Sequence, residues 1–211
     1  MEPHSTSKRA FDPVLGDPRF APRYAAYEVK GTLLGARRRY VQEEYGAEAL
    51  AKLKGAVSAE ARQYLDDDPL PFAWYPLEVL VEIDRQIVLG PMDGRVAEMK
   101  YFGDRIARYD LNTLYKMLFK LGTPSFVLKR IGTAYGLYFR GGGGVRAESL
   151  GDRRMQLSFR DAVQPYYMCK YGISGWLHAS VDLSGGRNIG IDHERCVHSG
   201  DPTCVWKVSW G

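Results

Sequence analysis

The sequence predicts an α+β fold in which a helical N-terminal half packs on a small antiparallel sheet crossed by one helix. Three observations support this prediction. Apolar residues recur at helical spacing from about residue 28 to residue 135. A run of four glycines, Gly141 to Gly144, then marks a change in pattern. After it, short alternating segments predict strands, and segregated helices and strands are typical of α+β domains.

The N-terminal half is expected to contain seven helical segments after an irregular, proline-containing arm over residues 1–26. Residues 27–211 are expected to form a single domain. Gly46 is predicted to end the first helix and Ser58 to cap a later one. Asp110 is predicted to cap a helix that continues to residue 121, and Pro124 to open the next. The expected segments are 28–46, 47–54, the turn after Ser58, 77–89, 92–108 and the two helices that begin after Asp110 and at Pro124.

The C-terminal half is expected to form two hairpins separated by a helix. The first hairpin pairs residues 145–150 with 153–159 around Gly151 and Asp152. The helix covers about residues 164–183. The second hairpin pairs residues 188–198 with 203–210, and alternate residues of its last strand share one face. The glycine run lacks the Lys-Ser/Thr of a phosphate loop and is expected to be a turn or loop.

The overall composition indicates an intracellular globular protein. The 211 residues carry a net charge of +4, and 12% of them are aromatic. The chain has no secretory signal pattern and no apolar run long enough to span a membrane, so we expect a cytoplasmic protein. The basic excess is small and Arg37, Arg38 and Arg39 splay around a helix, so nucleic acid is not expected as a partner.

The three cysteines give the strongest functional signal. Cys169, Cys196 and Cys204 all lie in the last fifth of the chain, and an odd number of cysteines argues against a disulfide framework. Cys196 and Cys204 fall on paired strands around one turn, so their thiols can converge. Thiolates with one further ligand suit a tetrahedral Zn²⁺ ion, and His193 is the nearest imidazole.

Two alternatives to this ligand set remain open. In an ideal strand His193 points away from the face of Cys196, whereas Asp192 and Glu194 share that face, so a histidine ligand requires a bulge or a strand end. Asp192 or Glu194 can therefore replace it. The other alternative is that the cysteines are simply small buried apolar residues, which is the commonest fate of a free thiol.

The same tail resembles the 4-vinyl reductase domain, which is also the effector-binding module of phenol- and toluene-sensing activators. The similarity is carried by Cys169-Lys-Tyr-Gly-Ile-Ser-Gly, by the seven-residue gap between Cys196 and Cys204, and by the aromatic Trp206. The resemblance implies a structural zinc ion beside an aromatic-lined ligand pocket. His193 departs from it, because the family pattern has glutamate there.

A second resemblance covers the N-terminal part, from Val29-Lys-Gly-Thr to Trp74-Tyr75-Pro76, which is similar to uncharacterised myxobacterial proteins that share the Gly-Asp-Pro-x-Cys tail. The wider superfamily includes nitric-oxide-signalling domains and Golgi-transport tethering subunits. This implies ligand or partner binding more than catalysis. Heme is not expected, because the Tyr-x-Ser-x-Arg motif of heme-binding members is missing.

These observations favour a sensory module that binds a small apolar or aromatic molecule and has a structural zinc site. The alternative is a homodimeric protein-interaction module with a filled core, and a tetrapyrrole vinyl reductase ranks last because no nicotinamide, flavin or iron–sulfur motif is present. An empty apolar pocket of roughly 300 Å³ or more would favour ligand binding. The expected pocket residues are Trp74, Tyr75, Phe102, Tyr115, Phe119, Tyr166, Tyr167 and Trp176.

Overall fold

The computed structural model describes residues 24–113, 122–161 and 164–211, and it confirms the α+β class. The irregular arm expected over residues 1–26 lies outside the described residues, except for its last three. The longer helices are α2 (Gly31–Ala56), α3 (Ala59–Asp66), α4 (Leu77–Leu89), α5 (Met99–Thr113), α7 (Pro124–Lys129), α8 (Ile131–Tyr138) and α9 (Ile173–Leu183). The short helical turns are η1 (Val96–Glu98), η2 (Met168–Gly172) and η3 (Val197–Ser199).

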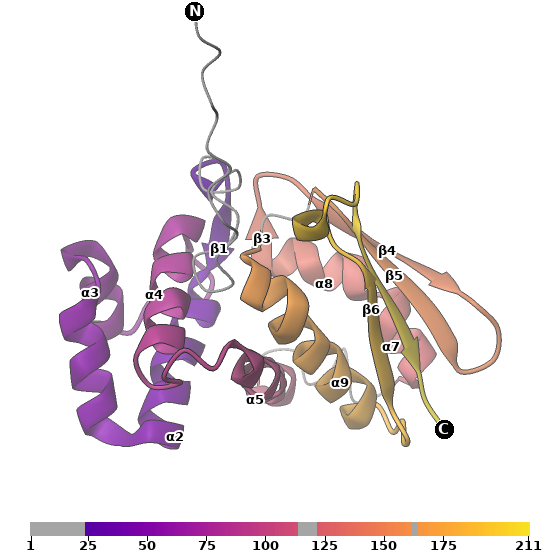
Figure 1. The fold of residues 1–211 in the computed structure, drawn as a ribbon, viewed down its shortest axis with the longest axis horizontal. Coiled ribbons are helices and arrows are strands. Elements are labelled where there is room, and N and C mark those ends of the chain that lie inside the picture. The colour runs from indigo at the N-terminus through magenta and orange to yellow at the C-terminus, as the bar shows by residue number, and fades with distance from the viewer. Residues whose placement is uncertain (1–23, 114–121, 162–163) are drawn as a thin grey trace, which may run out of the picture.

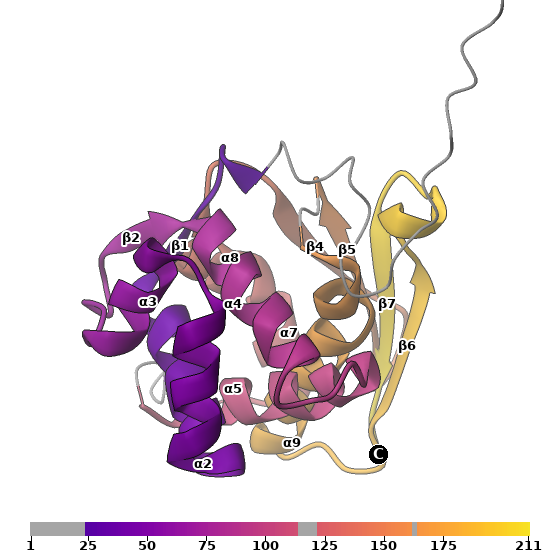
Figure 2. The same ribbon diagram turned by 60° about the vertical axis from the view of Figure 1, so that its left-hand side comes forward.

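The main sheet is antiparallel and has the strand order β4-β5-β7-β6. Its strands are β4 (Gly144–Ser149), β5 (Arg154–Arg160), β6 (Gly190–Arg195) and β7 (Cys204–Ser209). The two predicted hairpins therefore lie side by side, joined by the pairing of β5 with β7. Figures 1 and 2 show helix α9 between this sheet and the helical part of the molecule, as the predicted crossing helix requires.

Local sequence signals explain several helix ends. Gly46 takes a φ of +84° and separates two helical stretches within α2, which agrees with its predicted role as a helix end. The Ser58 side chain accepts a hydrogen bond from the backbone N–H of Ala61 at 3.2 Å and so caps α3. Pro124 is the first residue of α7, where its missing N–H costs no hydrogen bond.

A second, three-stranded sheet was not predicted. It has the order β2-β1-β3, with β1 (Glu28–Lys30) between β2 (Trp74–Pro76) and β3 (Phe139–Arg140). Residues 28–30 were expected to begin a helix, and that expectation is wrong. The sheet ties the start of α2 to two segments that are distant in the sequence.

Asp110 was also misassigned. It lies inside α5, which runs to Thr113, and its side chain is buried. A carboxylate just before an apolar stretch resembles a helix cap, but here the helix has already begun at Met99. The remainder of the helix expected up to residue 121 lies outside the described residues.

Apolar burial is divided among three clusters. The largest lies among α2, α3, α4 and α5, and the second lies between the sheet and α9. The third joins α5, α7, α8 and α9. Trp176 of α9 packs against all three clusters. Trp176 therefore lies at the junction where the helical part of the molecule meets the sheet.

Candidate metal centre and ligand cavity

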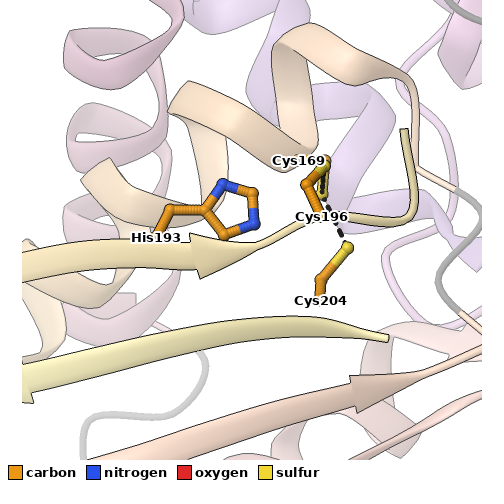
Figure 3. Close-up of side chains that lie close together, drawn as sticks. All are labelled: Cys169, His193, Cys196 and Cys204. Carbon is orange, nitrogen blue, oxygen red and sulfur yellow. Dashed lines mark hydrogen bonds between the residues drawn. The ribbon is translucent and has the colours of Figure 1, made fainter. Parts of the chain in front are cut away.

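Three thiols and one imidazole meet between η2 and the hairpin of β6 and β7 (Figure 3). The sulfur of Cys169 lies 3.7 Å from that of Cys196 and 3.1 Å from that of Cys204. With a ring nitrogen of His193, the four ligand atoms lie within 4.8 Å of one another. All three cysteines are free and buried.

A β-bulge brings His193 into this group. His193 pairs with Trp206, but the next pair is Arg195 with Val205, so Glu194 is the extra residue in the ladder. The extra residue reverses the alternation, and His193 and Cys196 can then reach one site. Figure 3 shows the His193 ring pointing along the strand toward the cysteines.

The same bulge separates the two alternative ligands from the cluster. Glu194 forms a salt bridge with Lys207 at 2.6 Å, and Asp192 is exposed. The His193 ring instead stacks on Trp206 with centroids 4.0 Å apart. Both of its nitrogens are buried, and among the described residues neither makes a hydrogen bond of normal geometry. The imidazole does act on the Cys196 thiol, whose pKa it helps to lower, and a buried ring with no stronger partner favours binding of an ion there.

The thiol pKa values are shifted by their mutual hydrogen bonds. The bonds from Cys169 and Cys204 lower the pKa of Cys196, although burial acts in the opposite direction. The pKa of Cys169 is raised well above its usual range, first by its bond to Cys196 and then by its bond to Cys204 and by burial. One sulfur thus carries negative charge easily, and the remaining protons would be displaced when a cation binds.

Backbone contacts fix the loop that holds the cluster. Asp201 accepts a hydrogen bond from the Cys196 N–H at 2.8 Å, and the Val197 N–H donates to the Cys204 sulfur at 3.4 Å. Sulfurs around a tetrahedral ion at about 2.3 Å lie roughly 3.8 Å apart. The sulfur separation of 3.7 Å between Cys169 and Cys196 is close to that value. This donor set suits a soft transition-metal ion.

An apolar cavity of about 100 Å³ lies where the helical part meets the sheet. Helix α5 contributes Phe102, and α9 contributes Trp176. Turn η2 contributes Met168, which precedes Cys169 of the thiol cluster. The other lining residues are Leu33, Arg37, Gly103, Ile106, Ile131, Ala134, Tyr135, Tyr138, Phe139, Val145, Phe159, Gln164, Gly172 and Ile173.

Of the expected pocket residues that the structure describes, Phe102 and Trp176 alone line this cavity. Trp74 lies under the ammonium of Lys30, and Tyr75 packs against Tyr64. Two further aromatic rings face elsewhere: Tyr166 contacts Tyr171 and His198, and Tyr167 donates a hydrogen bond to the Val81 carbonyl at 3.2 Å. Tyr115 and Phe119 lie outside the described residues.

Two polar residues of the cavity wall, Arg37 and Gln164, were not predicted from the sequence. Arg37 is 2% exposed and forms a bidentate pair with Asp84, at 2.9 and 3.1 Å. Its position between Leu34 and Tyr40 on the apolar face of α2 was the signal for its burial. Gln164 is 6% exposed, and its Oε1 has no hydrogen-bond partner among the described residues.

Comparison with solved structures identifies the fold. An H-NOX protein from Shewanella oneidensis in the Fe(II)NO ligation state has a TM-score of 0.69 and 15% identity, covering 86% of this chain and 99% of that chain. An unliganded Fe(II) H-NOX protein from K. algicida has a TM-score of 0.64 and 9% identity, with 86% and 96% covered. A protein described in terms of heme redox potential and porphyrin distortion has a TM-score of 0.63 and 12% identity, with 86% and 99% covered. No family model and no curated protein matches. The similarity to these solved structures shows that the chain has the fold of H-NOX domains.

These comparisons correct two expectations. The resemblance to the 4-vinyl reductase domain is wrong, because the fold is that of H-NOX proteins. No family model supports the second resemblance, to myxobacterial proteins. Zinc as the cofactor is also overturned, because the solved proteins of this fold are described by heme and its iron ligands.

None of the described helices is long and apolar enough to cross a membrane.

The cavity itself does not fit heme. Its volume of about 100 Å³ is far below the roughly 300–1,000 Å³ of pockets that hold drug-sized ligands. Phe102, Tyr138 and Trp176 occupy the junction, and neither histidine nor cysteine is among the described lining residues. Arg37, the only cationic side chain among the described lining residues, is already paired with Asp84.

Proposed function

We propose that this protein is a sensory module that binds a small, mostly apolar molecule without heme. The observation that supports this most strongly is the apolar cavity between the helical part and the sheet. An engineered cavity of about 150 Å³ takes up benzene, so a cavity of about 100 Å³ suits a ligand of similar or smaller size once the wall adjusts. Met168 and Trp176 give a bound ligand contact with η2 and α9 together.

Gln164 adds a polar requirement to this ligand. Its unpartnered Oε1 can accept a hydrogen bond, and satisfying a buried acceptor is favourable by about 1–3 kcal/mol. A ligand with an apolar body and one hydroxyl or amine therefore fits better than a pure hydrocarbon. Arg37, the charged side chain of the described cavity wall, is already paired with Asp84. A charged ligand is therefore disfavoured here.

Benzene and phenol form a matched pair of probes for this cavity. In amide-resolved NMR titrations we expect saturable shifts along α5, α8 and α9 with both, and tighter binding of phenol. Ala134→Leu fills the cavity and should abolish binding, whereas Ala51→Leu on the exposed face of α2 should not. Gln164→Leu should remove the preference for phenol. Equal binding by the Ala134→Leu variant would contradict the proposal.

We further propose that Cys169, His193, Cys196 and Cys204 bind a structural transition-metal ion. Their ligand atoms already converge, and the His193 nitrogens are otherwise unpartnered. Elemental mass spectrometry of the purified protein should identify one bound ion, and Co²⁺ added to stripped protein should give the absorption of a thiolate-bound tetrahedral ion. His193→Ala should weaken both signals, whereas His178→Ala should not, because His178 pairs with Asp104 outside the cluster.

A protein-interaction module with a filled core is the second candidate function. The cavity is smaller than the roughly 300 Å³ that would favour ligand binding on volume alone. A homodimer is the expected assembly in that case. Light scattering that finds a stable dimer, together with no saturable binding of either probe, would favour this function over the first.

A further inference from the structure

A second recess lies on the opposite side of the N-terminal half of α2 and has a different chemistry. It is a groove of about 790 Å³ between α2, the loop of residues 68–71 and the last described turns of α5. Two arginines, a tyrosine and a buried carboxyl group face it, whereas the cavity proposed above is apolar. The lining residues are Gly31, Thr32, Gly35, Ala36, Arg38, Arg39, Gln42, Asp68, Pro69, Leu70, Pro71, Tyr109 and Asp110.

The arginine run divides between the protein interior and this groove. Arg37 points inward to Asp84, and the next two arginines line the groove. Arg38 pairs with Asp68, whose side chain is 87% exposed, so water competes strongly for that contact. Arg39 is exposed and lies over the Tyr109 ring at 5.3 Å, and no salt bridge of Arg39 is found among the described residues. Both guanidinium groups can therefore bind an anion.

The groove is preformed by backbone contacts. The Gly31 N–H donates to the Ala73 carbonyl at 3.0 Å, and the Thr32 N–H donates to the Pro71 carbonyl at 3.2 Å. The Leu70 N–H donates to the Tyr75 hydroxyl at 3.0 Å. These bonds hold the loop against α2, so a ligand would not have to order it, which removes one cost of binding.

The walls combine positive charge with apolar surface. Leu70 is 71% exposed at the rim, and Tyr109 contributes an aromatic face. At the base, burial raises the pKa of Asp110 to about 7, and Thr32 donates a hydrogen bond to it at 3.3 Å. Near neutral pH this carboxyl group is therefore only partly charged, and the two arginines outweigh the acidic groups of the groove.

We propose that this groove is a second binding site, specific for a small organic anion with a flat apolar body. Arg38 and Arg39 bind the carboxylate or phosphate group, since guanidinium groups match the geometry of both oxyanions. Tyr109 and Leu70 contact the apolar body. The anion takes the place of Asp68 on Arg38, so Asp68 acts as an internal competitor.

Phenyl phosphate, inorganic phosphate and benzoate serve as probes in isothermal titration calorimetry with the full chain. We expect phenyl phosphate to bind at least tenfold more tightly than inorganic phosphate, because only the former uses the apolar wall. Comparison with benzoate tells whether the groove prefers phosphate or carboxylate. Arg38→Gln combined with Arg39→Gln should weaken phenyl phosphate binding at least tenfold, and Asp68→Asn should strengthen it several-fold.

Two control variants keep this site separate from the cavity. Arg154→Gln removes an exposed arginine of β5 and should leave phenyl phosphate binding unchanged. Ala134→Leu fills the apolar cavity and should also leave it unchanged, so failure of one site does not imply failure of the other. Absence of phenyl phosphate binding to the unaltered protein, or equal binding by the double arginine variant, would overturn the proposal.

Discussion

The buried charges of this protein are concentrated where the helices meet. Arg37 and Asp84 are both 2% exposed, and their two hydrogen bonds compensate for the loss of water. Removing one partner of such a pair leaves an uncompensated buried charge, at a cost of about 3–5 kcal/mol. Arg37 also faces the cavity, and its burial brings Arg38 and Arg39 to the outer groove. One ion pair therefore orients residues of both recesses.

Asp110 should make the stability of the protein depend on pH. Burial raises the pKa of Asp110 from 3.8 to about 7, so between these values the folded protein holds a proton that the unfolded chain releases. The contribution of Asp110 to the free energy of unfolding is fully present below about pH 4 and is lost as the pH rises to about 7. Asp110→Asn should remove that decline, so the difference in unfolding free energy between variant and parent should grow by roughly 3 kcal/mol between pH 4.5 and 8.

Urea unfolding at a series of pH values measures this difference. Asp68→Asn is the matched control, because Asp68 is 87% exposed and should give a curve parallel to that of the parent. A parallel curve for Asp110→Asn would show that the carboxyl group titrates normally in the folded protein.

Helix α5 packs closely against α9 and the preceding turn η2, and glycines permit this contact. A Cβ on Gly103 would lie 2.0 Å from the Gly172 carbonyl oxygen, and one on Gly175 would lie 1.8 Å from the Lys100 carbonyl oxygen. Both atoms belong to helical backbone, which cannot move aside as a side chain can. This close contact sets the position of η2, and with it the positions of Met168 and Cys169.

Gly175→Ala should therefore be strongly destabilising. Overpacking typically costs about 1–3 kcal/mol, and a clash with backbone belongs at or above the upper end. Gly136→Ala in α8 is the matched control, because apart from its own helix turn no described residue places an atom within 4 Å of the added Cβ. That change should be neutral or stabilise the protein by up to about 1 kcal/mol. Chemical denaturation of the two variants measures both effects, and similar values for them would refute the role of the close contact.

Elements with strong local signals could be predicted, and those made by distant pairing could not. The apolar spacing of Leu77–Leu89 and its closing Gly90 predicted α4 to the residue. The sheet of β1, β2 and β3 has strands of two or three residues, which are too short to show alternation. The sequence also indicated that His193 needs a bulge to join the cysteines, and Glu194 provides it.

The thiol cluster could be predicted from the sequence, whereas the apolar cavity could not. Cysteine is rare, so three near one hairpin are informative, and their side chains meet. Aromatic residues line every core, so their presence did not locate the cavity. Tyr167 and Trp176 are both aromatic residues of the predicted 164–183 helix. Of these two, Trp176 lines the cavity and Tyr167 does not. Which face of a helix meets a void depends on the packing of all the elements around it.

Considered as a whole molecule, the protein has a helical core and a sheet core that meet at η2 and α9. The thiol cluster belongs to the sheet core, which contains Cys169, Cys196 and Cys204 together with Trp206. Helix α4, by contrast, belongs to the helical core. An ion in the cluster would tie η2 to the hairpin of β6 and β7 without contacting α4.

Metal removal should therefore loosen the two cores unequally. Because a metal contributes its binding free energy only to the structure that forms its site, stripping the ion should speed hydrogen exchange in η2 and β7 at least tenfold. Amides of α4 should change much less. Hydrogen-exchange mass spectrometry of loaded and stripped protein makes this comparison, and Cys169→Ser should behave like the stripped form whether or not metal is added. Equal loss of protection in α4 and β7 would mean that the two cores unfold as one unit and that the ion does not act locally on the sheet.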